Sequence, residues 1–213
     1  MEKMEIVKKY IERIVNAPMN LVGYKDVEEA FAYLYSDSVL PIKDEDLGEL
    51  FLDVGSGGGV PGVFLSIEFD KRALLIDSIC KKIDFVKKTC TELGINSVEA
   101  MCIRAEELKD VGDYFERFDA ATARAVSKVP TVLELAAPYV RIGGKILLYK
   151  GPGYNEELGR SISAMKELGV KLFETRTYSI HGKSRYLIVF EKVSPTPKKY
   201  PRKSGIPEKK PIR

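Results

Sequence analysis

The segment from Glu49 to Gly62 most constrains the fold, because it combines a strand, a glycine-rich turn and the start of a helix. Its apolar residues at 50–54 predict a short buried strand, with Asp53 near the end of it. Four glycines follow within five residues, and Pro61 then favours the first turn of a helix. Such an arrangement surrounds a pocket with backbone N–H groups, which suit the polar end of a nucleotide-like ligand. The segment therefore predicts a cofactor site.

Apolar runs and amphipathic segments alternate along the rest of the chain. This alternation predicts a Rossmann-like α/β fold, with helices on both faces of a parallel sheet. The last two apolar runs have no helix between them, so we expect a hairpin that places one antiparallel strand in a seven-stranded sheet. The expected strands are 50–54, 73–77, 98–103, 118–123, 145–149, 170–178 and 185–193, and the helices between them are 61–69, 79–93, 127–140 and 156–168.

The first forty residues favour helices. Apolar residues at helical spacing predict a first helix that ends before Pro18, and Asp26 is expected to cap a second helix over 27–34. Farther along, Gly94 and Gly143-Gly144 are expected to end two helices. We divide the chain into an N-terminal helical extension (1–45), a central cofactor domain (46–194) and a C-terminal arm (195–213).

The composition is that of an ordinary soluble globular protein, with 45% hydrophobic and 31% charged residues in a chain of 213. No apolar run approaches the roughly 18 residues of a membrane span. The N-terminal residues 1–9 mix Glu and Lys and contain no signal-peptide core. We therefore expect a cytoplasmic protein that does not bind a membrane, and we expect it to be a monomer.

The net charge of +3 is unevenly distributed. The C-terminal arm carries seven basic residues against one Glu, so the arm has a charge of +6 and the remaining chain has −3. This asymmetry indicates a nucleic-acid partner. Five prolines in the arm favour extended structure over a helix or a central strand. We expect the arm to pack on the body and to bind RNA phosphates through Lys198, Lys199, Arg202, Lys203, Lys209 and Lys210.

Cys80, Cys90 and Cys102 are odd in number and form no CxxC motif, so we expect neither a metal site nor a disulfide. Small buried apolar side chains are the expected role of these cysteines. The single histidine, His181, lies in a turn-like segment, which favours an exposed loop residue over a catalytic base.

The glycine motif leaves two cofactors open. Gly57-x-Gly59-x-x-Gly62 matches the dinucleotide fingerprint, and Asp77 ends the following strand, as in a nicotinamide-dependent oxidoreductase. The Asp-x-Gly-x-Gly pattern that begins at Asp53 instead resembles the glycine motif of S-adenosylmethionine-dependent methyltransferases. The terminal hairpin also resembles their reversed last strand. Because one cofactor domain uses nearly the whole chain, no second domain remains to carry a hydride acceptor.

S-adenosylmethionine also suits these residues chemically. Its carboxylate needs N–H donors, which the turn around Gly55 and Gly57 can supply. Its positive charges favour a nearby acid, and Asp53 is available. Its ribose diol suits acceptance by Asp77, whose alternative role is to cap the helix that follows Ile79.

Short motifs occur in a characteristic order along nearly the whole chain. They are Asn20-Leu21 with Asp37-Ser38, the loop 53–62 ending in Val-Pro-Gly, Leu75–Ser78 with Lys81-Lys82, Arg104–Glu107, Ala123–Ala125, Lys150-Gly151 and the tail 200–212. Together they resemble the small-subunit (16S) ribosomal RNA guanine-N7 methyltransferases, also called the glucose-inhibited division protein B family. The sequence departs from that family at Leu34, where the family usually has His.

The resemblance implies a class I methyltransferase fold and methyl transfer from S-adenosylmethionine to guanine N7 in 16S rRNA or a small-subunit precursor. It places Gly55, Val60, Ala105, Glu106 and Arg124 in the cofactor site. Since N7 carries no proton, no general base is needed, and Arg124 is the candidate for orienting the guanine or its phosphate. An arginine at this position can also pair with a carboxylate for stability.

Three other functions remain open at this point. They are a nicotinamide-dependent oxidoreductase, a non-catalytic RNA-binding ribosome assembly factor that keeps the cofactor fold, and a small-molecule methyltransferase. Titration with each cofactor distinguishes an oxidoreductase from an rRNA methyltransferase. A methyl-transfer assay distinguishes a non-catalytic assembly factor from an rRNA methyltransferase. The basic arm disfavours the third.

Overall fold

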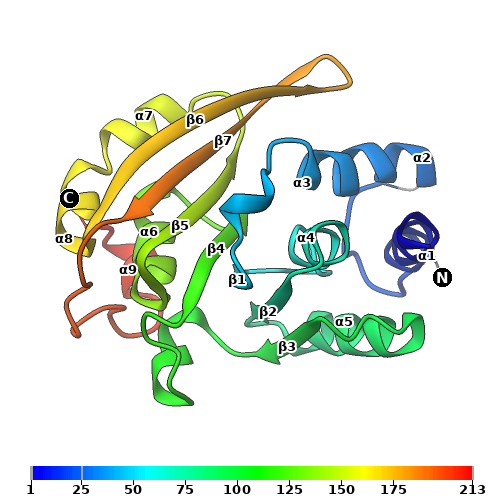
Figure 1. Cartoon of the computed structure of the whole chain (residues 1–213), viewed down its shortest axis with the longest axis horizontal. Coiled ribbons are helices and arrows are strands. Elements are labelled where there is room, and N and C mark those ends of the chain that lie inside the picture. Colours follow the sequence, from blue (N-terminus) through cyan, green and yellow to red (C-terminus); the bar gives the residue numbers. More distant parts are fainter. Residues whose placement is uncertain (1, 25, 213) are drawn as a thin grey trace.

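The computed structural model describes residues 2–24 and 26–212, and one seven-stranded sheet forms its centre (Figure 1). The strand order is β3-β2-β1-β4-β5-β7-β6. β7 is antiparallel to both of its neighbours and the other pairs are parallel, which confirms the predicted mostly parallel sheet with one reversed strand. The strands are β1 (Leu50–Val54), β2 (Arg72–Asp77), β3 (Val98–Cys102), β4 (Phe118–Arg124), β5 (Val140–Lys150), β6 (Val170–Ile180) and β7 (Lys183–Lys192).

The strand order reverses between β1 and β4. From β1 the chain builds outward through β2 to β3, then crosses back to place β4 on the other side of β1. In open α/β sheets, ligands bind beyond the carboxyl ends of the strands at such a reversal. The carboxyl ends of β1 and β4 are therefore where the fold favours a site.

Successive strand residues face two apolar layers. Phe51 of β1 packs in the layer that contains α1, α4 and α5, whereas its neighbour Leu52 packs in the layer that contains α6 and α8. This alternation follows from the period of two of a strand that is buried on both faces. The helices of these layers are α1 (Lys3–Val15), α4 (Gly62–Phe69), α5 (Cys80–Leu93), α6 (Val129–Ala136) and α8 (Ile162–Leu168).

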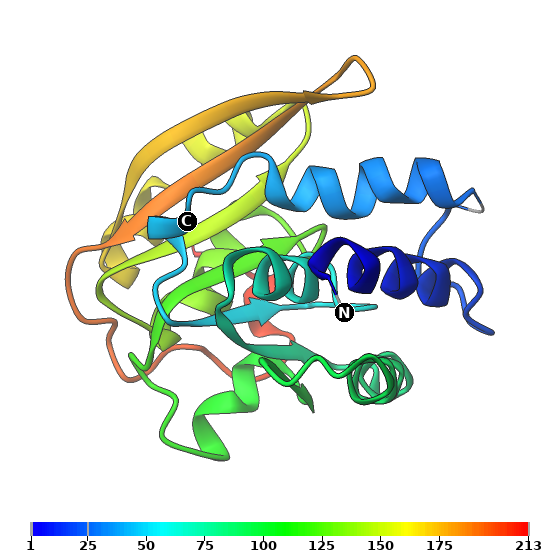
Figure 2. The same ribbon diagram turned by 45° about the vertical axis from the view of Figure 1, so that its right-hand side comes forward.

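The N-terminal extension packs as helices against α4 and α5. Asp26 accepts a hydrogen bond from the Glu29 amide at 2.8 Å, which confirms the predicted cap. The second helix is longer than predicted and contains a π-helical turn, so it consists of α2 (Val27–Ala30), η1 (Phe31–Ser36) and α3 (Asp37–Val39). Figure 2 shows this helix running alongside α1.

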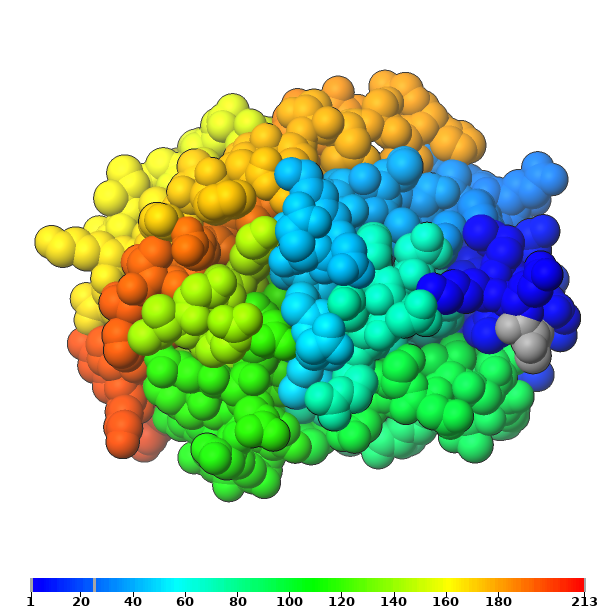
Figure 3. All heavy atoms as spheres, viewed as in Figure 1, coloured from blue at the N-terminus to red at the C-terminus, as the bar shows by residue number. Residues whose placement is uncertain are grey.

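The remaining elements are short turns of helix. They are η2 (Asp44–Asp46), η3 (Ala105–Asp110), η4 (Ala137–Tyr139), α7 (Tyr154–Gly159) and α9 (Ile206–Lys209). The predicted helix over 156–168 is therefore divided into α7 and α8. No helix within the described ranges is long and apolar enough to cross a membrane. Helix α1 lies at one end of the molecule, and the visible part of the C-terminal arm lies toward the other end (Figure 3).

The two glycine predictions had different outcomes. Gly94 ends α5 with φ of +69°, as expected for a left-handed helix cap. Gly143-Gly144 does not end a helix but lies inside β5, so that prediction was wrong. At Gly144 the strand passes so close to β4 that an added Cβ would lie 2.5 Å from the Asp119 carbonyl oxygen. Close backbone approach, rather than a helix end, explains this glycine.

Cys80 and Cys102 form a disulfide bond, with their Cα atoms 4.9 Å apart, so the expectation of no disulfide was wrong. The spacing of the cysteines could not reveal this pair. Cys102 lies opposite Asp77 in the register of β2 and β3, and Cys80 begins α5 just after Asp77. The bond therefore joins the end of β3 to the start of α5. Cys90 is a buried free thiol, as expected.

Reduction of this bond is expected to lower the free energy of unfolding by about 3 kcal/mol, because a cross-link of this loop length removes entropy from the unfolded chain. Thermal unfolding of the oxidised protein with and without a thiol reductant measures the effect. A variant carrying Cys80→Ser and Cys102→Ser should unfold at one temperature under both conditions. Equal stability of the reduced and oxidised wild-type protein would contradict a stabilising bond.

Candidate active site

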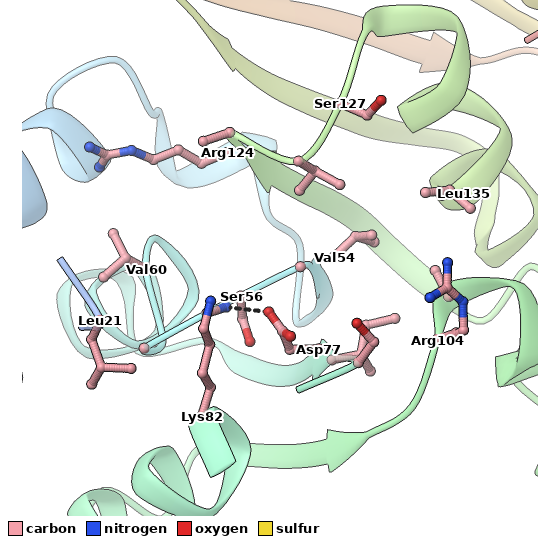
Figure 4. A pocket seen from close by; sticks show the side chains of 18 of the residues that line it. Leu21, Val54, Ser56, Val60, Asp77, Lys82, Arg104, Arg124, Ser127 and Leu135 are labelled. Carbon is pink, nitrogen blue, oxygen red and sulfur yellow. Dashed lines mark hydrogen bonds between the residues drawn. The ribbon is translucent and has the colours of Figure 1, made fainter. Parts of the chain in front are cut away.

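A pocket of about 470 Å³ lies beyond the carboxyl ends of β1, β2 and β4, at the reversal of strand order (Figure 4). This volume suits a nucleoside-sized ligand. The glycine loop, η3, the N-terminal extension and the C-terminal arm all contribute walls. The predicted cofactor residues that line the pocket are Gly55, Gly57, Val60, Asp77, Ala105, Glu106 and Arg124.

The glycine loop, residues 55–60, directs most of its backbone N–H groups into the protein. Those of Gly55 and Ser56 donate to the Ile76 carbonyl oxygen at 2.8 and 3.0 Å. Two further amides of the loop donate to the Ser56 carbonyl oxygen. These hydrogen bonds shape the loop against β2. With the bond from the Gly57 amide to Asp77, protein acceptors engage five of the six loop amides, so the expectation that loop amides hold the ligand's carboxylate remains a prediction for Gly58.

Asp53 is fully buried beneath the pocket and does not line it. Its two oxygens accept hydrogen bonds from the Gly62 amide at 2.9 Å and the Thr122 hydroxyl at 2.8 Å. Burial raises the pKa of the Asp53 carboxyl to about 7, although these two hydrogen bonds act to lower it. The expected contact between Asp53 and the ligand's positive charges is thus replaced by a structural role, in which Asp53 fixes the start of α4 against β4.

Asp77 lies in the pocket wall at the end of β2, as predicted. One oxygen accepts a hydrogen bond from the Gly57 amide at 2.9 Å, the contact drawn in Figure 4, and the other accepts from the Ile79 amide at 2.8 Å. The expected cap is therefore present. Because a carboxylate offers about four acceptor positions, Asp77 can still accept hydrogen bonds from ligand hydroxyls.

Two polar groups in the pocket wall are buried without a hydrogen-bond partner among the described residues. They are Ser56 Oγ and Arg124 Nη1. An unpaired buried polar group costs about 1–3 kcal/mol, so both groups indicate a polar ligand. Sequence reasoning missed the Ser56 side chain. Ser56 interrupts the glycine run 55–59 with a side chain that carries a hydroxyl. That hydroxyl is the feature from which a ligand contact could have been inferred.

Arg124 ends β4 at the pocket but extends toward the N-terminal extension. Its Nη2 donates to the Tyr33 carbonyl oxygen at 2.6 Å and lies 3.0 Å from a carboxylate oxygen of Asp37. In Figure 4 its guanidinium points away from Ser56 and Asp77. The carboxylate pairing considered for Arg124 is therefore present, and it connects the Asp37-Ser38 motif to the pocket.

The far wall of the pocket contains Ala105 and Glu106 of η3, as the resemblance implied. Pro207 and Glu208 of the C-terminal arm also line it, which the sequence did not predict. Glu106 connects the two segments, because its Oε1 accepts a hydrogen bond from the Gly205 amide at 2.8 Å.

The C-terminal arm packs on the body, as expected, but it is not wholly extended. Residues 206–209 form α9, so the expectation of no helix was wrong for this turn. Two of the predicted RNA-binding residues have protein partners. Arg202 binds the fully buried carboxylate of Glu134 at 2.6 Å, and Lys199 lies 2.7 Å from Glu167. The other four are exposed: Lys198, Lys203, Lys209 and Lys210.

Solved structures share this fold. TrmN from Thermus thermophilus matches with a TM-score of 0.58 over 90% of this chain and 53% of its own, at 16% sequence identity. A geranyl diphosphate C-methyltransferase from Streptomyces coelicolor matches with a TM-score of 0.54 over 78% of this chain and 80% of its own, at 13% identity. The fold is that of the class I S-adenosylmethionine-dependent methyltransferases.

The sequence comparisons identify the family. Residues 3–188 match the family described as rRNA small subunit methyltransferase G, or GidB. The ribosomal RNA small subunit methyltransferase G of Fervidobacterium nodosum is 70% identical over 213 residues, which cover 100% of both chains. The chain belongs to the rRNA small subunit methyltransferase G family, and the resemblance drawn from its motifs is confirmed.

Proposed function

We propose that the chain transfers a methyl group from S-adenosylmethionine to N7 of a guanosine in 16S rRNA. Membership of the methyltransferase G family supports this function. The observation that carries it in the structure is the pocket beyond β1, β2 and β4, with Asp77 and two unpaired buried polar groups in its wall. The dinucleotide alternative has no comparable support, because the matching family and its relatives are rRNA methyltransferases.

The residues in the wall fit this methyl donor. Asp77 retains acceptor positions for the ribose hydroxyls. The Ser56 hydroxyl is a hydrogen-bond donor that suits the carboxylate of S-adenosylmethionine. The Gly58 amide is the loop amide that can add to this contact, since the other five donate to acceptors within the protein. Ala105 and Glu106 form the wall for the adenine at the opposite end.

Methyl transfer to N7 depends on the alignment of the two reactants and needs no proton transfer. S-adenosylmethionine supplies an electrophilic methyl group, and guanine N7 offers a lone pair without a proton to remove. The protein therefore needs to align N7 with the methyl carbon, and proximity of this kind is worth up to about 7–11 kcal/mol. Arg124 remains the candidate for orienting the guanine or its phosphate, and Asp37 holds its guanidinium in place.

The exposed lysines of the C-terminal arm are proposed to bind RNA phosphates. Lys198, Lys203, Lys209 and Lys210 retain this role. Arg202 and Lys199 contribute to it less, because each already pairs with a glutamate. We expect the protein to act as a monomer in the cytoplasm, on 16S rRNA or on a small-subunit precursor.

The proposal predicts transfer of labelled methyl from S-adenosylmethionine to one guanosine of 16S rRNA taken from cells that lack the protein. Mapping the modified nucleotide by its N7-specific strand cleavage measures the product.

Asp77→Ala should reduce kcat/KM by about tenfold or more, because a ligand hydrogen bond to a charged group contributes about 1.5–3 kcal/mol. Replacement of the four exposed lysines by Ala should flatten the salt dependence of RNA binding. Label at an atom other than N7, or no label in any RNA substrate, would contradict the proposal.

A further inference from the structure

The C-terminal arm makes a series of contacts with η3, the segment that forms the adenine wall of the pocket. Lys109 Nζ donates to the Pro201 carbonyl oxygen at 3.0 Å, and the Ser204 hydroxyl donates to the Glu107 carboxylate at 2.8 Å. The Gly205 amide then donates to Glu106 at 2.8 Å. The arm thus runs along η3 and is hydrogen-bonded to it at three places.

The same segment of the arm is held on its other side by α6. Arg202 directs its backbone amide, Nε and Nη2 to the Glu134 carboxylate at 3.0, 2.8 and 2.6 Å. Glu134 is fully buried, so this charge-assisted contact anchors the arm. Farther along, the Thr131 hydroxyl donates to the Pro207 carbonyl oxygen at 3.1 Å.

The arm therefore bridges two elements that come from opposite sides of the strand reversal. η3 follows β3 and α6 follows β4, and no backbone hydrogen bond of the sheet joins those two strands. At the bridge, Pro207 and Glu208 face the pocket. Pro207 is buried, so its ring forms a rigid part of the wall rather than a solvent-exposed tail.

We propose that residues 204–208 of the C-terminal arm are part of the cofactor site and close its adenine end. Glu106 is the link, because it lies in the pocket wall and its carboxylate holds the Gly205 amide. Binding of the adenosine part of the cofactor and docking of the arm then stabilise each other. This inference rests on the proposed function, in which S-adenosylmethionine occupies this pocket.

Two variants separate this role from general stability. A chain that ends at Lys203 loses the contacts of Ser204, Gly205 and Pro207, yet keeps Arg202 on Glu134, so the buried carboxylate remains paired. Glu167→Ala is the matched control. Glu167 lies on α8, outside the pocket wall, and its replacement removes contacts to Lys199 and Tyr200 of the same arm.

Calorimetric titration with S-adenosylhomocysteine measures the affinity of each protein without any RNA. We expect the shortened chain to bind at least about tenfold more weakly than the intact chain, and Glu167→Ala to bind within about twofold of it. Because coupling is reciprocal, S-adenosylhomocysteine should also slow hydrogen exchange at the Lys209 and Lys210 amides of the intact chain. This second measurement needs no variant, so it stands even where the shortened chain is unstable.

The outcomes are distinguishable. If the intact chain binds S-adenosylhomocysteine but exchange in the arm is unchanged and the shortened chain binds equally well, the arm is no part of the site. If the intact chain does not bind S-adenosylhomocysteine at all, the proposed function falls, and this inference falls with it.

Discussion

The Asp46→Ala variant is expected to lose about 3 kcal/mol or more of its free energy of unfolding. Asp46 is almost fully buried at 1% exposure, between two cations. It accepts a hydrogen bond from Lys145 Nζ at 2.7 Å and two from the guanidinium of Arg176. Removing the carboxylate leaves these partly buried cations without their main partner. Denaturant unfolding at neutral pH measures the loss.

The pH dependence of this contribution follows from the Asp46 pKa. Burial alone would raise that pKa, but the hydrogen bonds from Arg176, Lys145 and the Lys43 amide outweigh burial and lower it. The stabilisation is therefore present at neutral pH and is lost as pH falls below about 4 through the lowered pKa. Asp44→Ala on the same turn is the control, since Asp44 is exposed and should change stability by less than about 1 kcal/mol. Similar losses in both variants would contradict this account.

The Asp53→Asn variant is expected to become more stable relative to the wild-type protein as pH rises from about 4 to about 8. In the folded protein the pKa of Asp53 is raised to about 7 from its ordinary value of 3.8, because the carboxyl is buried. A raised pKa means that the protonated carboxyl favours the folded state at low pH, and that this advantage is lost as pH rises through 7. A shift of this size corresponds to roughly 4 kcal/mol.

Asparagine can keep both contacts of Asp53, because its amide oxygen accepts from the Gly62 amide and its NH₂ donates to the Thr122 hydroxyl. The measurement is the difference in unfolding free energy between the two proteins across that pH range. Asp53→Ala is the matched comparison. It should be less stable by about 1–3 kcal/mol, because the buried Gly62 amide loses its acceptor. A difference between Asp53→Asn and the wild-type protein that does not change with pH would show that Asp53 does not titrate near 7.

The sequence predicted those parts of the fold that depend on local patterns. The seven predicted runs became β1 to β7, and the signal was plainest in central strands such as β1 and β2, where burial on both faces needs a continuous apolar run. The cap at Asp26 and the stop at Gly94 also depend on neighbouring residues only. The Cys80–Cys102 bond and the strand position of Gly144 depend instead on the register between strands. Nothing in the linear spacing of those residues records that register.

The same distinction applies to the site. Asp77 could be predicted because the end of a strand beside a glycine loop faces the pocket in this fold. The direction of the Asp53 side chain could not, because its partner Thr122 lies 69 residues away on β4. Pro207 was also beyond prediction, because the arm reaches the pocket through tertiary contacts with Glu106 and Glu134. The basic composition of the arm predicted RNA binding only, and not the proposed part of residues 204–208 in the cofactor site.

The central claim is that the methyl donor binds in the pocket between the glycine loop, Asp77 and η3. A crystal structure of the protein with S-adenosylhomocysteine tests it most directly. The account predicts ribose hydroxyls within hydrogen-bond distance of Asp77, the amino-acid end beside Ser56 Oγ, and the adenine against Ala105. Density for S-adenosylhomocysteine outside this pocket, or bound with its ribose away from Asp77, would contradict it.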